Sequence, residues 1–251
     1  MGFNSTKCKI MHFGKRNRKF KYTLGGSQLE ESQKEKDVGV IINNKLTPFD
    51  QCAQAAKRAN QALGMLKRSF KFRDMNIWPR LYKAIVRSKL EYCNTIWRPT
   101  TKRDREVLER VQKRAMSCIH GLEGLTYEEK LYECNITNLE ERRDRGDMLQ
   151  TYKIIHKKDD TGSYQHLEMV DTTRCGSQTR QNSDPHNVKQ PKAKTAYGQR
   201  RFAARIAKKW NDLPKEIKSA PSVDSFKNKY DSYMRARKEI ELKELRNNQR
   251  R

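Results

Sequence analysis

Apolar residues are scarce in this sequence. Only 35% of the 251 residues are hydrophobic, against 34% that carry a charge. No apolar run approaches the roughly 18 residues that a membrane-spanning helix needs, so we expect no transmembrane segment. Six cysteines stand apart without a Cys-x-x-Cys pair, which predicts reduced thiols rather than a disulfide framework or a metal site. This pattern is typical of an intracellular protein, nuclear or cytoplasmic.

Acidic residues are also few compared with basic residues. The chain has 55 Lys and Arg but only 30 Asp and Glu, a net charge of +25. The excess is spread out: residues 1–70 hold 14 basic and 5 acidic residues, and residues 197–251 hold 16 and 7. A folded basic surface of this size predicts a polyanionic partner, RNA or DNA. The plainer alternative is a charged surface that only contacts water.

Catalytic motifs are also missing. We find no G-x-S-x-G, no H-E-x-x-H and no phosphate-binding P-loop. Two-metal phosphoryl chemistry needs clustered carboxylates, whereas the acidic residues here mostly alternate with Arg and Lys along predicted helices. We therefore predict that this chain alone is not an enzyme and has no cofactor.

Hydrophobic periodicity predicts an α+β fold that is mostly α. Residues 81–97 have two adjacent apolar faces and one polar stripe (Arg80, Lys83, Arg87, Glu91), which predicts a largely buried helix. A second helix is expected over residues 104–120. The preceding 49 residues predict a small antiparallel β-sheet, with strands at 9–13, 19–24 and 36–42.

The same reading divides the chain into four parts. A β region at residues 1–49 precedes a helical bundle at 50–157, a flexible linker at 158–196 and C-terminal helices at 197–251. Capping boxes at Thr126-x-x-Glu129 and Thr137-x-x-Glu140 predict two helix starts in the bundle. In the last part, we expect helices over 197–210 and after Ser222, with fraying from Arg235.

The helix expected over residues 50–70 has a second face of interest. Opposite its apolar side, small, polar and cationic side chains recur at helical spacing. This composition suits close approach to a nucleic-acid backbone. An ordinary solvated helix face has the same spacing. The residues of this stripe are Gln54, Lys57, Gln61, Gly64 and Arg68.

Seven blocks, in order, resemble the reverse transcriptases of non-LTR (LINE-type, jockey-like) retrotransposons. They span most of the chain: KCKIMHFG (7–14), YTLGG (22–26), EKDVGVIINNKL (35–46), LYKAIVRSKLEYCNTIWRP (81–99), LERVQKRA (108–115), LEERRDRGDM (139–148) and WNDLPKEIKSAPSVDSFK (210–227). The resemblance covers only the C-terminal part of such a polymerase. It implies that finger and palm motifs, with their Mg²⁺-binding aspartates, precede residue 1 of a longer parent protein.

The resemblance also implies roles for particular residues. Lys7 or Lys9 matches the lysine thought to help protonate pyrophosphate, and 37–40 corresponds to the primer grip. The helices over 50–120 correspond to the thumb, which holds the primer–template duplex; Ser88 replaces a common proline, which implies a straighter central helix. The expected nucleic-acid-binding residues are Lys36, Gly39, Gln54, Lys57, Arg58, Gln61, Gly64, Arg68, Lys83 and Arg87.

Two alternatives remain at this point. Met1, Gly2 and Thr6 fit the loose N-myristoylation pattern, and basic residues follow over 7–21, which together would anchor a membrane-associated interaction protein. The chain could also be the functionless product of a decayed element.

Overall fold

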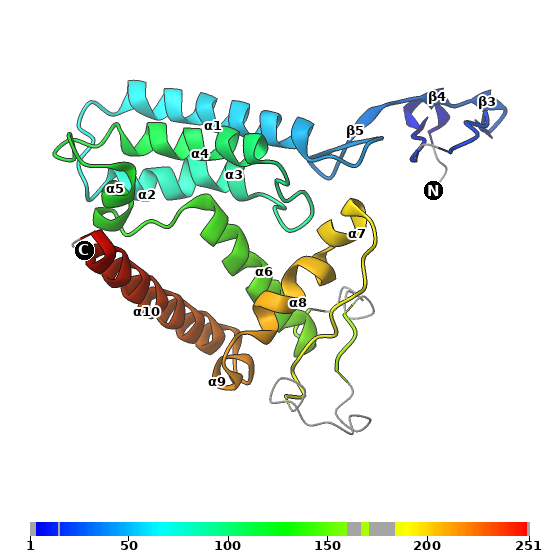
Figure 1. Cartoon of the computed structure of the whole chain (residues 1–251). Helices are drawn as coiled ribbons and strands as arrows, with labels where there is room; N and C mark the ends of the chain where they lie inside the picture. Colours follow the sequence, from blue (N-terminus) through cyan, green and yellow to red (C-terminus); the bar gives the residue numbers. More distant parts are fainter. Residues whose placement is uncertain (1–3, 15, 160–166, 171–183, 250–251) are drawn as a thin grey trace. The chain divides into compact units, whose positions relative to one another are not determined.

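The fold is α+β and mostly α, as predicted. The computed structural model describes residues 4–14, 16–159, 167–170 and 184–249. Short β-strands near the N-terminus precede a series of helices (Figure 1). The chain divides into two compact units, Met1–Arg143 and Asp144–Arg251, each with its own hydrophobic core.

The N-terminal strands form three separate pairs rather than one sheet. Two pairs are antiparallel, whereas the pair that contains Lys9 is parallel. The turn at Gly25-Gly26 joins one antiparallel pair, as predicted, and both glycines have positive φ angles. The pairs are β1 (Lys9–Ile10) with β4 (Glu30–Glu31), β2 (Thr23–Leu24) with β3 (Ser27–Gln28), and β5 (Lys34–Asp37) with β6 (Val40–Asn43).

The single strand predicted over residues 36–42 is wrong, because the chain reverses there. Asp37 pairs with Val40, and the two residues between them form the turn of the β5–β6 hairpin. Val38 and Gly39 have φ angles of 43° and 84°, as a two-residue primed turn requires. A β-branched residue is unusual in such a turn, so the sequence pattern concealed it.

Side chains of the next helix hold this hairpin. The backbone N–H of Ile41 donates to Gln51 Oε1 at 2.9 Å, and Asn43 Nδ2 donates to Asp50 Oδ2 at 2.7 Å. Val40 is buried in the core of the first unit. The hairpin is therefore attached to the first turn of α1 (Phe49–Ser69).

The helices of the first unit form a bundle. α1 packs against α4 (Lys102–Met116) and against the helix formed by α2 (Trp78–Leu81), η2 (Tyr82–Arg87) and α3 (Ser88–Glu91) (Figure 1). Trp78 Nε1 donates to the carbonyl of Ala115 at 2.8 Å, which joins two of these helices. Cys52 is buried in this core, and burial raises the pKa of its thiol to about 12.

The central helix differs from the prediction in two ways. It ends at Glu91 instead of Trp97, because Cys93 adopts a φ angle of 52° and the chain turns. Trp97 is still buried, with its indole N–H donating to the carbonyl of Tyr92 at 2.6 Å. The helix is also not regular, since η2 is π-helical and immediately precedes Ser88. The straighter course expected at Ser88 stays a prediction.

One of the two predicted capping boxes is present. Thr126 and Glu129 cap α5 (Tyr127–Glu133) with both expected hydrogen bonds. At the next helix, α6 (Leu139–Ile155), the capping residue is Asn138 instead of Thr137. Asn138 Oδ1 accepts from the backbone N–H of Glu141 at 2.8 Å. Asn138 offers a side-chain oxygen that can cap the helix as Thr137 could, so the motif predicted a helix start one residue too early.

The second unit is built around aromatic side chains. Three aromatic residues are fully buried: Tyr152, Trp210 and Phe226. The ring centroids of Tyr152 and Phe226 are 4.5 Å apart. The single helix predicted over 197–210 is broken at Arg201, where ψ is 147°. Ser222 caps the last helix, as predicted. The remaining helices are α7 (Ala196–Arg200), α8 (Phe202–Asn211), α9 (Lys215–Lys218) and α10 (Val223–Gln249).

Some residues of the expected linker belong to this core. Leu167 and Val188 are buried, and Met169 pairs with Val188 in an isolated β-bridge. Asp184 forms an ion pair with Lys218, whose Nζ lies 2.7 Å from Asp184 Oδ2. The boundaries proposed at 49, 157 and 196 stay predictions.

Candidate nucleic-acid interface

The α1 helix has an apolar face that packs on the core and a polar face that is exposed to solvent. Ala55, Ala59 and Leu63 face the core, and the small alanine side chains let the neighbouring helices approach closely. The opposite face carries Lys57, Gln61 and Arg68, which are exposed. The packing of the apolar side therefore fixes which residues meet solvent.

The exposed face of α1 holds a hollow of 500 Å³. We call this hollow the α1 groove. Four of its five lining residues were predicted from the sequence, and Asn60 was not. Its residues are Lys57, Asn60, Gln61, Gly64 and Arg68.

Arg114 adds a further cation beside the α1 groove. Its Nη1 donates to Asn60 Oδ1 at 3.1 Å, so α4 contributes charge next to a groove residue. Gly64 leaves the middle of the groove open, since an added Cβ would meet only Arg68 Nη1, at 3.7 Å. Asn60 could have been found from its spacing, three residues after Lys57, whereas Arg114 comes from a different helix.

The other predicted residues of α1 lie outside the groove lining. Gln54 and Arg58 are half-buried and do not line the hollow. The sequence stripe thus marked the face correctly but extended one turn too far toward the N-terminus.

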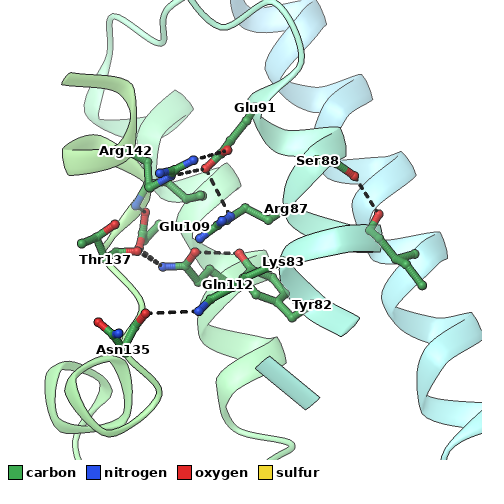
Figure 2. Close-up of polar contacts among 12 residues, drawn as sticks. Tyr82, Lys83, Arg87, Ser88, Glu91, Glu109, Gln112, Asn135, Thr137 and Arg142 are labelled. Atoms are coloured by element: carbon green, nitrogen blue, oxygen red, sulfur yellow. Dashed lines mark hydrogen bonds and ion pairs between the residues drawn. The ribbon is translucent and has the colours of Figure 1, made fainter. Parts of the chain in front are cut away.

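Lys83 and Arg87 make internal contacts (Figure 2). Arg87 Nε lies 3.4 Å from Glu91 Oε1, and Arg142 binds the same carboxylate through Nε and Nη2 at 3.0 and 3.1 Å. Lys83 Nζ donates to the carbonyl of Asn135 at 3.3 Å, and burial, with the charge of Arg87, lowers the pKa of Lys83. The structure does not bring these two residues into the α1 groove.

A buried hydrogen-bond network lies beside them. Tyr82 OH donates to Gln112 Oε1 at 2.6 Å, and Gln112 Nε2 donates to the carbonyl of Thr137 at 3.0 Å (Figure 2). Gln112 also donates to Tyr127 OH. This network ties the central helix to α4 and to the start of α6, so it holds the bundle behind α1.

Two of the predicted nucleic-acid-binding residues, Lys36 and Gly39, lie on the β5–β6 hairpin and have different surroundings. Lys36 is exposed on β5, opposite Ile41. Gly39 lies under Tyr92, whose ring would be 3.2 Å from an added Cβ. Tyr92 OH donates to the carbonyl of Val38 at 3.0 Å, so this tyrosine fixes the hairpin tip.

The two lysines considered for catalysis are on the N-terminal segment. Lys7 is exposed at the end of a 3₁₀ turn, Ser5–Lys7. Lys9 Nζ lies 3.3 Å from Glu35 and 3.9 Å from Glu30. Hydrogen bonds from Ser32 and from Lys9 lower the pKa of Glu35. Lys9 is therefore paired within the chain.

Candidate metal ligands do not cluster in the described part of the chain. Within that part, no group of three or more His, Cys, Asp and Glu side chains is placed to hold an ion.

Membrane-spanning segments are not found among the described helices. None of them combines the length and the hydrophobicity needed to cross a bilayer. Met1 and Gly2, on which the acylation motif depends, lie outside the described residues.

Comparisons with known proteins give no relative. No family model, no curated protein and no solved structure matches the chain. The resemblance to retrotransposon reverse transcriptases therefore rests on its seven sequence blocks alone.

Proposed function

We propose that this chain binds nucleic-acid duplexes through the α1 groove, without sequence preference. Under this proposal it acts as the thumb-like part of a non-LTR reverse transcriptase and holds the primer–template duplex. Finger and palm parts of the parent protein would be its partners. No chemical step is assigned to the chain itself.

The observation that carries the proposal is the composition of the α1 groove. Lys57 and Arg68 lie on either side of Gly64, about three turns of helix apart in total. Cations can contact phosphates, and Asn60 and Gln61 offer amides to phosphate and sugar oxygens. The absence of a side chain at Gly64 lets a backbone approach the helix. The net charge of +25 adds long-range attraction.

The rigidity of α1 supports the same proposal. Its apolar face is buried along the whole helix, from Cys52 to Leu66. The groove residues are therefore positioned before a ligand arrives, which lowers the entropic cost of binding. Exposed lysines on a loose segment would lack this advantage.

The proposal is tested by removing two groove charges. Each phosphate contact is worth about 1 kcal/mol at low salt, so Lys57→Gln with Arg68→Gln should weaken affinity for an RNA–DNA duplex at least about tenfold. Affinity is measured by fluorescence anisotropy, with circular dichroism as the check on folding. Both side chains are exposed, so the fold should be unchanged.

The matched control removes two charges elsewhere. Lys208 and Lys215 are exposed in the second unit, and Lys208→Gln with Lys215→Gln changes the net charge by the same amount. We expect a loss of less than threefold for this control. Equal losses in the two double variants would mean that diffuse charge binds the duplex and that the α1 groove has no special role.

A further inference from the structure

A second hollow, of 510 Å³, lies within the first unit beside α4. We call it the α4 cavity. Residues of α4, of α5 and of the segment 138–143 line it. Its size is in the range of small-molecule sites. The basic residues that line it are Lys102, Arg105, Arg110, Lys113 and Arg143.

Arg143 is the unusual member of this set. Its side chain lines the cavity although the residue is only 3% exposed. The structure describes no hydrogen bond or ion pair of its guanidinium, and none of its nitrogens is both fully buried and without a partner, so they are not sealed off from the hollow. Burial, together with the charge of Arg98, lowers its pKa, and the charges of Glu109 and Glu140 act against that shift. A mostly buried guanidinium needs acceptors for its donors, and a hollow beside it gives water or a bound anion access to them.

The neighbouring arginines, Arg142 and Arg145, each bind a carboxylate, whereas Arg143 does not. Arg142 binds Glu91 through two nitrogens, at 3.0 and 3.1 Å. Arg145 binds Asp231 in the same way, at 2.6 and 2.7 Å. Arg143 lies between them in sequence and has no such carboxylate. Its side chain lines the hollow, and the carboxylates that act on its charge, Glu109 and Glu140, do not bind it in this bidentate way.

Four carboxylates line the cavity, those of Glu106, Glu109, Glu128 and Glu140, and three of them have other partners. Glu109 accepts hydrogen bonds from Tyr127 OH and, at 3.1 Å, from the backbone N–H of Leu139. Glu106 lies 3.8 Å from Lys102, and Glu140 lies 3.9 Å from Arg105. None of them lies within ion-pair distance of Arg143. The acidic residues thus leave its positive charge only partly balanced.

We propose that the α4 cavity binds a phosphate group, with Arg143 as its buried bidentate partner and Arg110 and Lys113 as further cations. A guanidinium binds a phosphate through two parallel hydrogen bonds, which satisfies the donors that the protein leaves open. The hollow exceeds a phosphate ion in size, so the group can belong to a nucleotide or to the end of a strand. This site is separate from the α1 groove and does not depend on its function.

The test uses the full chain with three probes at constant ionic strength. These are inorganic phosphate, AMP and a 5′-phosphorylated dinucleotide, and binding is followed by calorimetry and by the rise in melting temperature. We expect saturable binding of at least one probe. The probe that binds most tightly identifies the source of the phosphate.

Two variants locate the site. Arg143→Gln should reduce affinity at least tenfold without lowering the melting temperature of the free protein, since it removes an unpaired buried charge. Arg110 is exposed, so Arg110→Gln keeps the fold and should reduce affinity several-fold. Arg80→Gln, an exposed control in the same unit, should have no effect. The α1 groove double variant should bind the probe normally, which separates this site from duplex binding.

Three results would overturn the inference. One is the absence of saturable binding for all three probes. Another is unchanged affinity in both Arg143→Gln and Arg110→Gln. The third is a large loss of stability in ligand-free Arg143→Gln together with unchanged probe affinity in Arg110→Gln, because that combination means a structural arginine.

Discussion

Val38 has a backbone conformation that β-branched residues rarely adopt. Its φ angle is 43° at the tip of the β5–β6 hairpin, and the residue is 78% exposed. Packing therefore does not compensate for the strain. Tyr92, whose hydroxyl donates to the Val38 carbonyl, holds the turn in place from outside.

The first prediction follows from this strain. Asparagine is favoured before glycine in a primed turn, so Val38→Asn should stabilise the protein by about 1 kcal/mol. Urea unfolding of the full chain measures the change. Val38→Ile keeps the β-branch and should leave stability unchanged, and a gain of equal size in that control would refute the explanation.

The second unit contains a buried ion pair between Lys218 and Asp184. Lys218 is 2% exposed, and its Nζ lies 2.7 Å from both Asp184 Oδ2 and Asn187 Oδ1. Burial acts to raise the pKa of Asp184, but Lys218 and the N–H of His186 outweigh it and hold that pKa below its ordinary value. The ionised form is therefore the one that the fold stabilises.

The second prediction concerns pH. A lowered carboxyl pKa gives stability that is present above the unfolded pKa, near 4, and is lost as pH falls through the folded value. Asp184→Asn should cost about 3 kcal/mol at pH 7, since it leaves Lys218 buried without a counter-charge. The difference from the unmodified protein should shrink below about pH 4. Asp212→Asn, at an exposed position, is the control; a constant difference between pH 7 and pH 3 would contradict the prediction.

At the scale of elements, the sequence predicted helix faces well and helix ends poorly. The apolar side of α1 was predictable because Cys52, Ala55, Ala59, Leu63 and Leu66 recur with the period of a helix. The end of the central helix at Glu91 was not, because Trp97 continues the apolar pattern. Trp97 reaches the core after a turn instead, with its indole bonded to the carbonyl of Tyr92.

The two candidate sites also differ in how far the sequence could predict them. The α1 groove lies on one helix, so four of its residues follow from local spacing. The α4 cavity depends on how α4, α5 and the segment 138–143 meet, which no local pattern encodes. In the sequence Arg143 is one more charge in the alternating run EERRDRGD. Only tertiary structure distinguishes it from Arg142 and Arg145.

The third prediction belongs to α1. Space around Gly64 is open apart from Arg68, so Gly64→Ala should stabilise the helix by up to about 1 kcal/mol and leave duplex affinity nearly unchanged. Gly64→Leu should be equally stable but bind a duplex several-fold more weakly, because its side chain occupies the groove. Thermal unfolding and anisotropy measure the two effects. Unchanged affinity in Gly64→Leu would mean that no backbone approaches this position.

At the scale of the whole molecule, the charge of +25 complicates any binding assay. The excess is distributed over both units, so any polyanion is attracted to some extent. A change in affinity at one salt concentration therefore does not separate a local contact from general attraction. The dependence of affinity on salt does, because it counts the phosphates that are neutralised.

The most direct measurement is thus the slope of log affinity against log salt for an RNA–DNA duplex. Each phosphate contact contributes about one unit. We predict that Lys57→Gln with Arg68→Gln lowers the slope by about two units, and that Lys208→Gln with Lys215→Gln changes it by less than half a unit. An unchanged slope in the first variant, or an equal decrease in the second, would contradict binding through the α1 groove.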